Sequence, residues 1–222
     1  CSLGAADPAD PASSSKLAAV VAISAAAVSR GDKVVVVSTS TAALDAVGGA
    51  LAAVSPPLAT VRIDGAVDAA RRQAVVDAFN NRSAADPAYG GSVLLLSMRA
   101  GGAGLNLVGA SVLVMTDMDW NPAVCAQAAA RCWRPGQTRP CAVLRLHTAG
   151  TIDERLLQRV HHKSGLSVAL EGGGKGAPPG GGGPAARRPN APAFTPAELR
   201  ALFTLDAGVA TCVTRGLLVK GE

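Results

Sequence analysis

Short apolar runs that do not alternate with polar residues recur along this chain. Lys33–Val37, Ser92–Leu96 and Val112–Met115 are rich in valine and leucine, and each is bounded by polar or turn-forming residues. Such runs are typical of strands that are buried on both faces of a parallel sheet. The sequence therefore predicts a sheet whose core is built from these three strands.

Segments with helical character lie between and after these runs. The helices are expected over Ser15–Ser29, over Thr41–Ala53, from the N-cap Asp68 to Phe79, and from Asn121 and Pro122 onward. Two further strands are expected, over Thr60–Ile63 and Ala142–Leu146. Alternating strands and helices predict an α/β fold, a doubly wound parallel sheet with helices on both faces.

In a sheet of this kind, ligands bind beyond the carboxyl ends of the strands. The loops after Leu96 and Met115, and the segment Gln127–Gln137, are therefore the candidate sites. A later helix is expected to begin at its N-cap Thr151, and its apolar face consists of Ile152, Leu156, Leu157 and Val160.

Composition divides the chain into four parts. Residues 1–14 have no apolar periodicity and are expected to be a disordered lead-in. Residues 15–170 carry the α/β pattern, and residues 171–193 form a Gly/Pro-rich flexible linker. Residues 194–222 form a tail with a short helix, for which Thr195 begins a capping box.

Charge and cysteine content narrow the class of protein. The formal net charge is +5 and the pI is about 9.2, which is compatible with a nucleic-acid partner. The five cysteines form no C-x-x-C pair, so reduced, packed thiols are expected. The apolar segment Leu17–Val28 is too short to span a membrane, and no signal peptide is evident, so the chain is expected to be soluble and intracellular.

A glycine-rich segment, Leu96–Leu107, directly follows a predicted buried strand. Gly101, Gly102 and Gly104 allow the backbone to approach a ligand and to point N–H groups at an anion. The segment is neither a Walker A loop nor a dinucleotide fingerprint. Contact with a phosphate or nucleotide and an ordinary tight turn both remain open from these residues alone.

Two carboxylates, Asp117 and Asp119, lie at the end of another predicted strand. They suggest a metal site, but no third type of ligand lies nearby, and the favoured interpretation is a positional one. In that interpretation Asn121 and Pro122 start the helix that presents the next motif, and Trp120 packs beside it.

The segment Gln127–Gln137 contains two arginines with small residues between them. Gln127 and Arg131 are one helical turn apart, so both are expected to face the same cleft, with Arg134 near the helix end. Two guanidinium groups on one face suit a polyphosphate, because each binds phosphate oxygens bidentately. Solvated arginines on an exposed helix are the alternative, although the neighbouring alanines and Trp133 argue against full exposure.

Five segments, taken in order, resemble the second lobe of SWI/SNF-type ATPases in helicase superfamily two. They are Lys33–Ser38, Arg62–Gly65, Leu96–Leu107, Asp119–Pro122 and Gln127–Gln137. The Arg-x-x-Arg-x-Gly-Gln ending differs from that of DEAD-box RNA helicases, which usually continue with Gly-Arg. The resemblance covers most of residues 15–205.

Within that family the chain is similar to the recombination-repair translocase of the Rad group. The similarity lies in Trp133, where most members have histidine, and in Ala149–Glu154, Gln158–Arg159, His161–Lys163 and Phe194–Phe203. Pro135 departs from the family, which usually has an acidic residue there, but it is not at a catalytic position.

The resemblance implies a RecA-like lobe and half of an enzyme. In this family the nucleotide lies between two RecA-like lobes, and the first lobe carries the phosphate-binding loop and the magnesium-binding Asp-Glu pair. This chain contains neither motif. ATP with Mg²⁺ held by the first lobe is therefore the implied cofactor, and the chain alone is expected to be inactive.

The resemblance also implies roles for single residues. Arg134, and with it Arg131, are assigned as arginine fingers on the γ-phosphate. The residues implied on the nucleotide side are Gln127, Gly102, Gly104 and Asn106. Those implied on the DNA backbone are Ser97, Arg99 and Gly101. No metal ligand is expected in this chain.

The implied function is that of the second motor lobe of a double-stranded DNA translocase in homologous recombination and repair, located in the nucleus. Its implied partners are duplex DNA, the first lobe and a recombinase filament, with no membrane. Two alternatives remain open, a chromatin-remodelling lobe and a non-catalytic DNA- or protein-binding module.

Overall fold

The structure is a computed structural model that describes residues 10, 14–81, 91–99, 104–119, 121–155, 157 and 200. The chain divides into two compact units, residues 1–147 and residues 148–222. The first unit contains the sheet and the candidate site. Within the described residues, no helix is long and apolar enough to cross a membrane.

Five parallel strands form one sheet in the order β2-β3-β1-β4-β5. The strands are β1 (Val34–Ser38), β2 (Thr60–Ile63), β3 (Val93–Ser97), β4 (Val112–Met115) and β5 (Ala142–Arg145). β1 is central, so Val34 pairs with Val93 on one side and with Val112 on the other. The fold class predicted from the sequence, a parallel α/β sheet, is confirmed.

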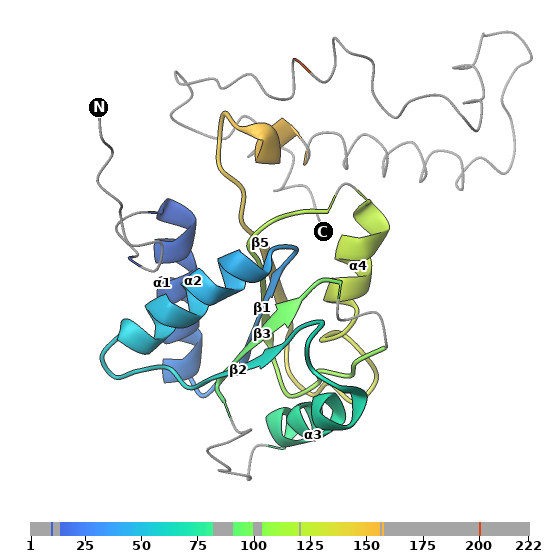
Figure 1. The fold of residues 1–222 in the computed structure, drawn as a ribbon. Coiled ribbons are helices and arrows are strands. Elements are labelled where there is room, and N and C mark those ends of the chain that lie inside the picture. Colours follow the sequence, from blue (N-terminus) through green and yellow to red (C-terminus); the bar gives the residue numbers. More distant parts are fainter. Residues whose placement is uncertain are drawn as a thin grey trace, which may run out of the picture. The chain divides into compact units, whose positions relative to one another are not determined.

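The helices α1 (Ser15–Ser29), α2 (Thr41–Ala53), α3 (Ala69–Asn80) and α4 (Pro122–Ala129) cover the sheet. Figure 1 shows α1 and α2 together on one side and α3 and α4 on the other. Valine, leucine and alanine from α1 and α2, and valine and leucine at alternate positions of β1, β3 and β4, form one core cluster. Every residue of β1, β3 and β4 is buried, as expected for strands covered on both faces.

Side-chain caps explain where the helices begin. Asp68 accepts a hydrogen bond from the Arg71 amide at 2.8 Å, and Asn121 accepts one from the Ala123 amide at 3.1 Å. Both N-caps are confirmed, because each oxygen satisfies an amide that the first helical turn leaves unpaired. At the other end of α1, Gly31 adopts φ +77°, a left-handed conformation that stops the helix.

The predicted bounds of α1, α2, β2 and β4 agree with the structure. β1 and β3 each begin and end one residue later than predicted, and β5 ends one residue earlier. The lead-in over residues 1–14, the linker over residues 171–193 and the tail over residues 194–222 lie outside the described residues, apart from Asp10, Ser14 and Arg200.

The predicted helix after Thr151 is described only at its start. Residues 152–155 and 157 are helical, and the Thr151 hydroxyl accepts a hydrogen bond from the Asp153 amide at 3.3 Å. The remainder of its predicted apolar face, Leu156 and Val160, lies outside the described residues.

Gly109 lies where the segment between β3 and β4 passes close to the end of α3. A β-carbon at this position would be 2.7 Å from the Cα of Asn80 and 2.9 Å from the carbonyl oxygen of Phe79. Both neighbours are backbone atoms and cannot turn aside. We expect Gly109→Ala to lower the free energy of unfolding by about 1–3 kcal/mol, as other overpacked substitutions do.

Urea denaturation of the full chain measures this effect. Gly65→Ala is the matched control, because nothing lies within 4 Å of the β-carbon it would add. Its free energy of unfolding should change by no more than about 0.5 kcal/mol. Equal denaturation midpoints for the two variants would contradict the close approach at Gly109.

Candidate functional site

The glycine-rich segment leaves the carboxyl end of β3 and leads to β4. Residues 100–103 lie outside the described residues, and with them the candidates Gly101 and Gly102. Gly104 is exposed and has φ +37°, which favours glycine. Arg99 and Asn106 are also exposed, whereas Ser97 is the last residue of β3 and is buried. Of the three candidate DNA contacts, Arg99 is therefore the one whose side chain is described on the surface.

Residues Gln127–Gln137, called the arginine segment below, differ from the regular helix that the spacing of Gln127 and Arg131 predicted. α4 ends at Ala129, and Cys132 then donates to the Ala129 carbonyl in a tight turn at 3.2 Å. Arg131 therefore lies beyond the helix, where the four-residue spacing from Gln127 no longer places two side chains on one face. Gln127 is exposed while Arg131 is only 9% exposed, and Arg134 is exposed.

Two hydrogen bonds connect the arginine segment to the glycine-rich segment, and a third connects it to the residues just before β4. The Leu107 amide donates to the Arg131 carbonyl at 3.0 Å. Arg134 Nη1 donates to the Gly104 carbonyl at 3.1 Å. Gln137 Nε2 donates to the Ala110 carbonyl at 2.7 Å. The two motifs, separate in the sequence, therefore lie against one another.

Arg131 is a buried cation with spare hydrogen-bonding capacity. Its Nη1 is fully enclosed and has no hydrogen-bond partner within the part of the chain that the structure describes. Burial lowers the pKa of this guanidinium, and the nearby charge of Arg134 lowers it further. An anion would relieve both effects, because it supplies an acceptor and an opposite charge.

The neighbouring thiol does not offer an alternative chemistry. Burial raises the pKa of Cys132 to about 12, and Cys141 adds to the shift. Thiolate is the nucleophilic form, so Cys132 remains a neutral, packed side chain near pH 7. Cys132 is therefore not a candidate nucleophile.

Asp117 has a structural role that differs from the positional one suggested by the sequence, which concerned Asn121, Pro122 and Trp120. Its carboxylate accepts hydrogen bonds from the Ser38 hydroxyl at 2.7 Å and from the Thr39 amide and hydroxyl at 2.9 and 3.0 Å. It therefore fastens the end of β1 to the end of β4. Among the described residues no group of three or more metal-binding side chains occurs.

Trp133 corrects one expectation. We expected the neighbouring alanines and Trp133 to keep the arginines from full exposure. Arg131 is only 9% exposed, as expected, whereas Arg134 is exposed and Trp133 itself is 77% exposed. The cause is the end of α4, because the turn after Ala129 directs residue 133 away from the core. Trp120, the other tryptophan, lies outside the described residues.

Sequence reasoning missed Asn80, which supports the glycine-rich segment from α3. Its Nδ2 donates to the Asn106 carbonyl at 2.7 Å, and its Oδ1 accepts from the Gly109 amide at 2.9 Å. A single asparagine at a helix end resembles an ordinary capping residue, so no pattern in the sequence indicated this contact.

Comparison with known proteins identifies the family. The model of the helicase conserved C-terminal domain matches residues 15–136, more than half of the chain. The chain belongs to this family. Together with the relatives and the solved structure given next, this match confirms the predicted resemblance to the second lobe of SWI/SNF-type ATPases. The parallel α/β sheet described above is the RecA-like fold of this helicase lobe.

Individual relatives and one solved structure agree with this assignment. A "DNA repair and recombination protein RAD54-like" from Drosophila erecta is 40% identical over 80% of this chain and 20% of its own length. The human protein of the same description is 46% identical over 63% of this chain and 18% of its own. The mouse "DNA repair and recombination protein RAD54B" is 41% identical over 72% of this chain and 16% of its own length.

The solved structure is the C-terminal part of the Fun30 ATPase domain. It is 30% identical, with a TM-score of 0.57, over 64% of this chain and 44% of that one. The helicase lobe spans about a fifth of the length of the curated relatives it matches.

Proposed function

We propose that this helicase lobe is the second motor lobe of an ATP-dependent double-stranded DNA translocase that acts in homologous recombination and repair. The observation that carries the proposal is the buried Arg131 Nη1 without a described partner, beside the exposed Arg134 and the glycine-rich segment bonded to both. Such a surface suits an anion whose negative charge increases during reaction.

On the nucleotide side, Arg131 and Arg134 serve as arginine fingers toward the γ-phosphate of ATP. Guanidinium groups bind phosphate oxygens in a forked geometry and stabilise charge that develops during phosphoryl transfer. The family resemblance also assigns Gly102, Gly104, Asn106 and Gln127 to this side. Gln127 would act there without sharing a helical face with Arg131, because α4 ends at Ala129. In this proposal the Mg²⁺ that accompanies ATP is held by the first lobe.

On the DNA side, Arg99 supplies the charge that a phosphate backbone requires, and Ser97 and Gly101 lie in the same segment. Contacts with phosphates are independent of base sequence and weaken as salt is added. Gly104 and Leu107 of the glycine-rich segment contact the arginine segment. The glycine-rich segment is therefore suited to couple the nucleotide state to the contact with DNA.

Alternate closing and opening of the two lobes would then move the protein along duplex DNA. The names of the relatives, DNA repair and recombination proteins, favour recombination over a chromatin-remodelling role. A nuclear location and a recombinase filament as partner belong to the same proposal. The alternative from another class is a non-catalytic module that binds DNA or protein.

ATP hydrolysis with and without duplex DNA tests the proposal. It is measured on this chain alone, on a separately expressed first lobe of a RAD54-like relative, and on the two joined by a linker. We expect hydrolysis stimulated by duplex DNA in the joined protein, with stimulation that falls as salt is added.

Hydrolysis by this chain alone would contradict the division of the site between two lobes. A joined protein that binds duplex DNA without hydrolysing ATP would favour the non-catalytic module. The linker holds the lobes at high effective concentration, so weak association between separate lobes does not obscure the result.

A further inference from the structure

The arginine segment is fastened at its far end by Gln137. The Gln137 side chain donates to the Ala110 carbonyl at 2.7 Å and to the Cys132 carbonyl at 3.3 Å, and its Oε1 accepts from the Arg139 amide at 3.0 Å. Its own backbone amide donates to the Arg134 carbonyl at 3.0 Å. Gln137 thus contacts three places: the backbone of Arg134, the backbone of Cys132 between the two arginines, and Ala110 just before β4.

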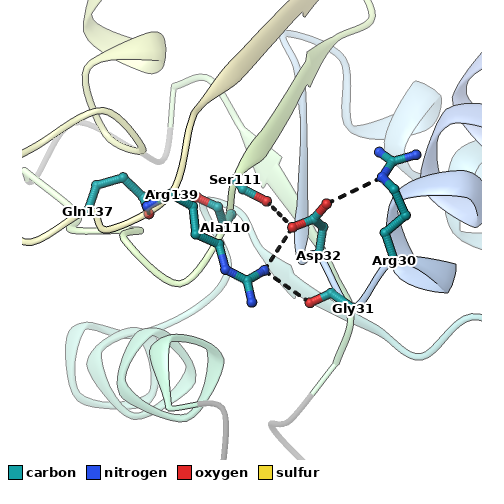
Figure 2. Close-up of polar contacts among 7 residues, drawn as sticks. All are labelled: Arg30, Gly31, Asp32, Ala110, Ser111, Gln137 and Arg139. Atoms are coloured by element: carbon teal, nitrogen blue, oxygen red, sulfur yellow. Dashed lines mark hydrogen bonds and ion pairs between the residues drawn. The ribbon is translucent and has the colours of Figure 1, made fainter.

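A charged cluster holds the residue two positions further along. Figure 2 shows Arg139 directed at Asp32, with Ser111 and Arg30 on the same carboxylate. Arg139 Nη1 donates to Asp32 Oδ1 at 2.8 Å and to the Gly31 carbonyl at 3.2 Å, and the Ser111 hydroxyl donates to Asp32 Oδ1 at 2.7 Å. Arg30 lies 3.6 Å from Oδ2.

The cluster is stable against protonation near neutral pH. The hydrogen bond from Ser111 lowers the pKa of Asp32, and Arg139 and Arg30 lower it further. The carboxylate is therefore charged at pH 7, and the support it gives is lost only as the pH falls through its lowered pKa. Arg139, whose amide donates to Gln137, is thus anchored to Asp32 and Ser111, which lie at the amino ends of β1 and β4.

We propose that Gln137 is a positioning residue for the two arginines, holding the peptide between them in the geometry that phosphoryl transfer requires. The inference rests on the proposed function. The Cys132 carbonyl that Gln137 binds belongs to the residue that follows Arg131 and precedes Trp133 and Arg134. A shift of this peptide therefore moves both guanidinium groups together, although neither would lose its own atoms or charge.

Two substitutions separate the bonds of Gln137. Gln137→Leu removes every side-chain hydrogen bond at similar volume. Gln137→Glu keeps an acceptor for the Arg139 amide but has no donor for the Ala110 and Cys132 carbonyls. Gln73→Leu is the matched control, because Gln73 bonds only with Asp77 on the exposed face of α3 in the described contacts.

In the joined two-lobe protein, we expect both Gln137 variants to lower kcat for ATP about 10²-fold, as small misplacements of catalytic groups do. KM should change much less, because the charges that attract the nucleotide remain. In an Arg134→Ala background the same substitutions should have a smaller effect, since the group that they misplace is absent. Gln73→Leu should leave kcat unchanged.

Amide hydrogen exchange on this chain alone gives a readout that needs no hydrolysis. The Leu107 amide, bonded to the Arg131 carbonyl, should exchange faster in both Gln137 variants while the amides of β1 keep their protection. Faster exchange over the whole sheet, with kcat reduced only by the unfolded fraction, would overturn the proposal in favour of a purely structural role. Unchanged exchange at Leu107 with wild-type kcat would overturn it as well.

The two proposals fail in different ways. If Arg134→Ala retains hydrolysis, the finger assignment is wrong, whereas exchange at Leu107 still tests the positioning by Gln137. If Gln137→Leu does not fold, Gln137→Glu carries the test, because it retains the bond to the Arg139 amide.

Discussion

Replacing Arg134 with alanine is expected to lower DNA-stimulated ATP turnover by about 10³–10⁵-fold, the range found where an arginine finger is removed. The side chain is exposed, and its one described hydrogen bond, to the Gly104 carbonyl, is on the surface. The loss should therefore come from transition-state charge that is no longer stabilised, not from unfolding. The measurement is steady-state hydrolysis by the joined two-lobe protein with saturating duplex DNA.

Arg134→Lys is the matched control for charge. Lysine keeps the positive charge but lacks the planar fork, so its turnover should lie between that of wild type and that of the alanine variant. The thermal midpoint of all three proteins should agree within about 1–2 °C, since exposed substitutions change stability little. Near-normal turnover by Arg134→Ala would refute the finger assignment.

Replacing Asp117 with alanine is expected to lower the free energy of unfolding by about 3–4 kcal/mol. Three donors on Ser38 and Thr39 lose a charged acceptor, and Ser38 is completely buried, so water cannot replace the carboxylate there. Hydrogen bonds to charged groups contribute about 1.5–3 kcal/mol each, and unsatisfied buried donors are costly. Urea denaturation of the full chain measures the change.

Asp119→Ala is the comparison, because Asp119 lies two residues away and accepts one described hydrogen bond, from the Asn121 amide at 2.8 Å. That variant should lose about 1 kcal/mol or less. If Asp119→Ala and Asp117→Ala were equally destabilised, the fastening of β1 to β4 would not be the role of Asp117. Asp117→Asn keeps one acceptor oxygen and should fall between the two.

The sequence predicted the sheet well because its signals are local. Unbroken runs of valine and leucine indicate buried strands, and Asp68 and Asn121 mark helix starts through a chemistry that needs only three neighbouring residues. The pairing of β1 with both β3 and β4 is not local. The rules for parallel sheets predicted the fold class, but not which strands lie next to each other.

The candidate site was harder to predict for a physical reason. Placing Gln127 and Arg131 on one face assumed that the helix continued, whereas α4 ends at Ala129. The burial of Arg131 and the exposure of Trp133 both depend on the turn that follows. Helical periodicity carries no information beyond the last helical residue, so neither side chain could be oriented from spacing alone.

The central place of β1 also affects how the lobe is made on the ribosome. This strand is synthesised before the others, yet both of its neighbours, β3 and β4, come much later in the chain. Until β4 has left the exit tunnel, the valines of β1 have no partner strand on that side and expose their backbone edge. The lobe is therefore expected to complete its sheet late in translation, and a pause between β3 and β4 would prolong the stage at which this apolar edge is open to aggregation.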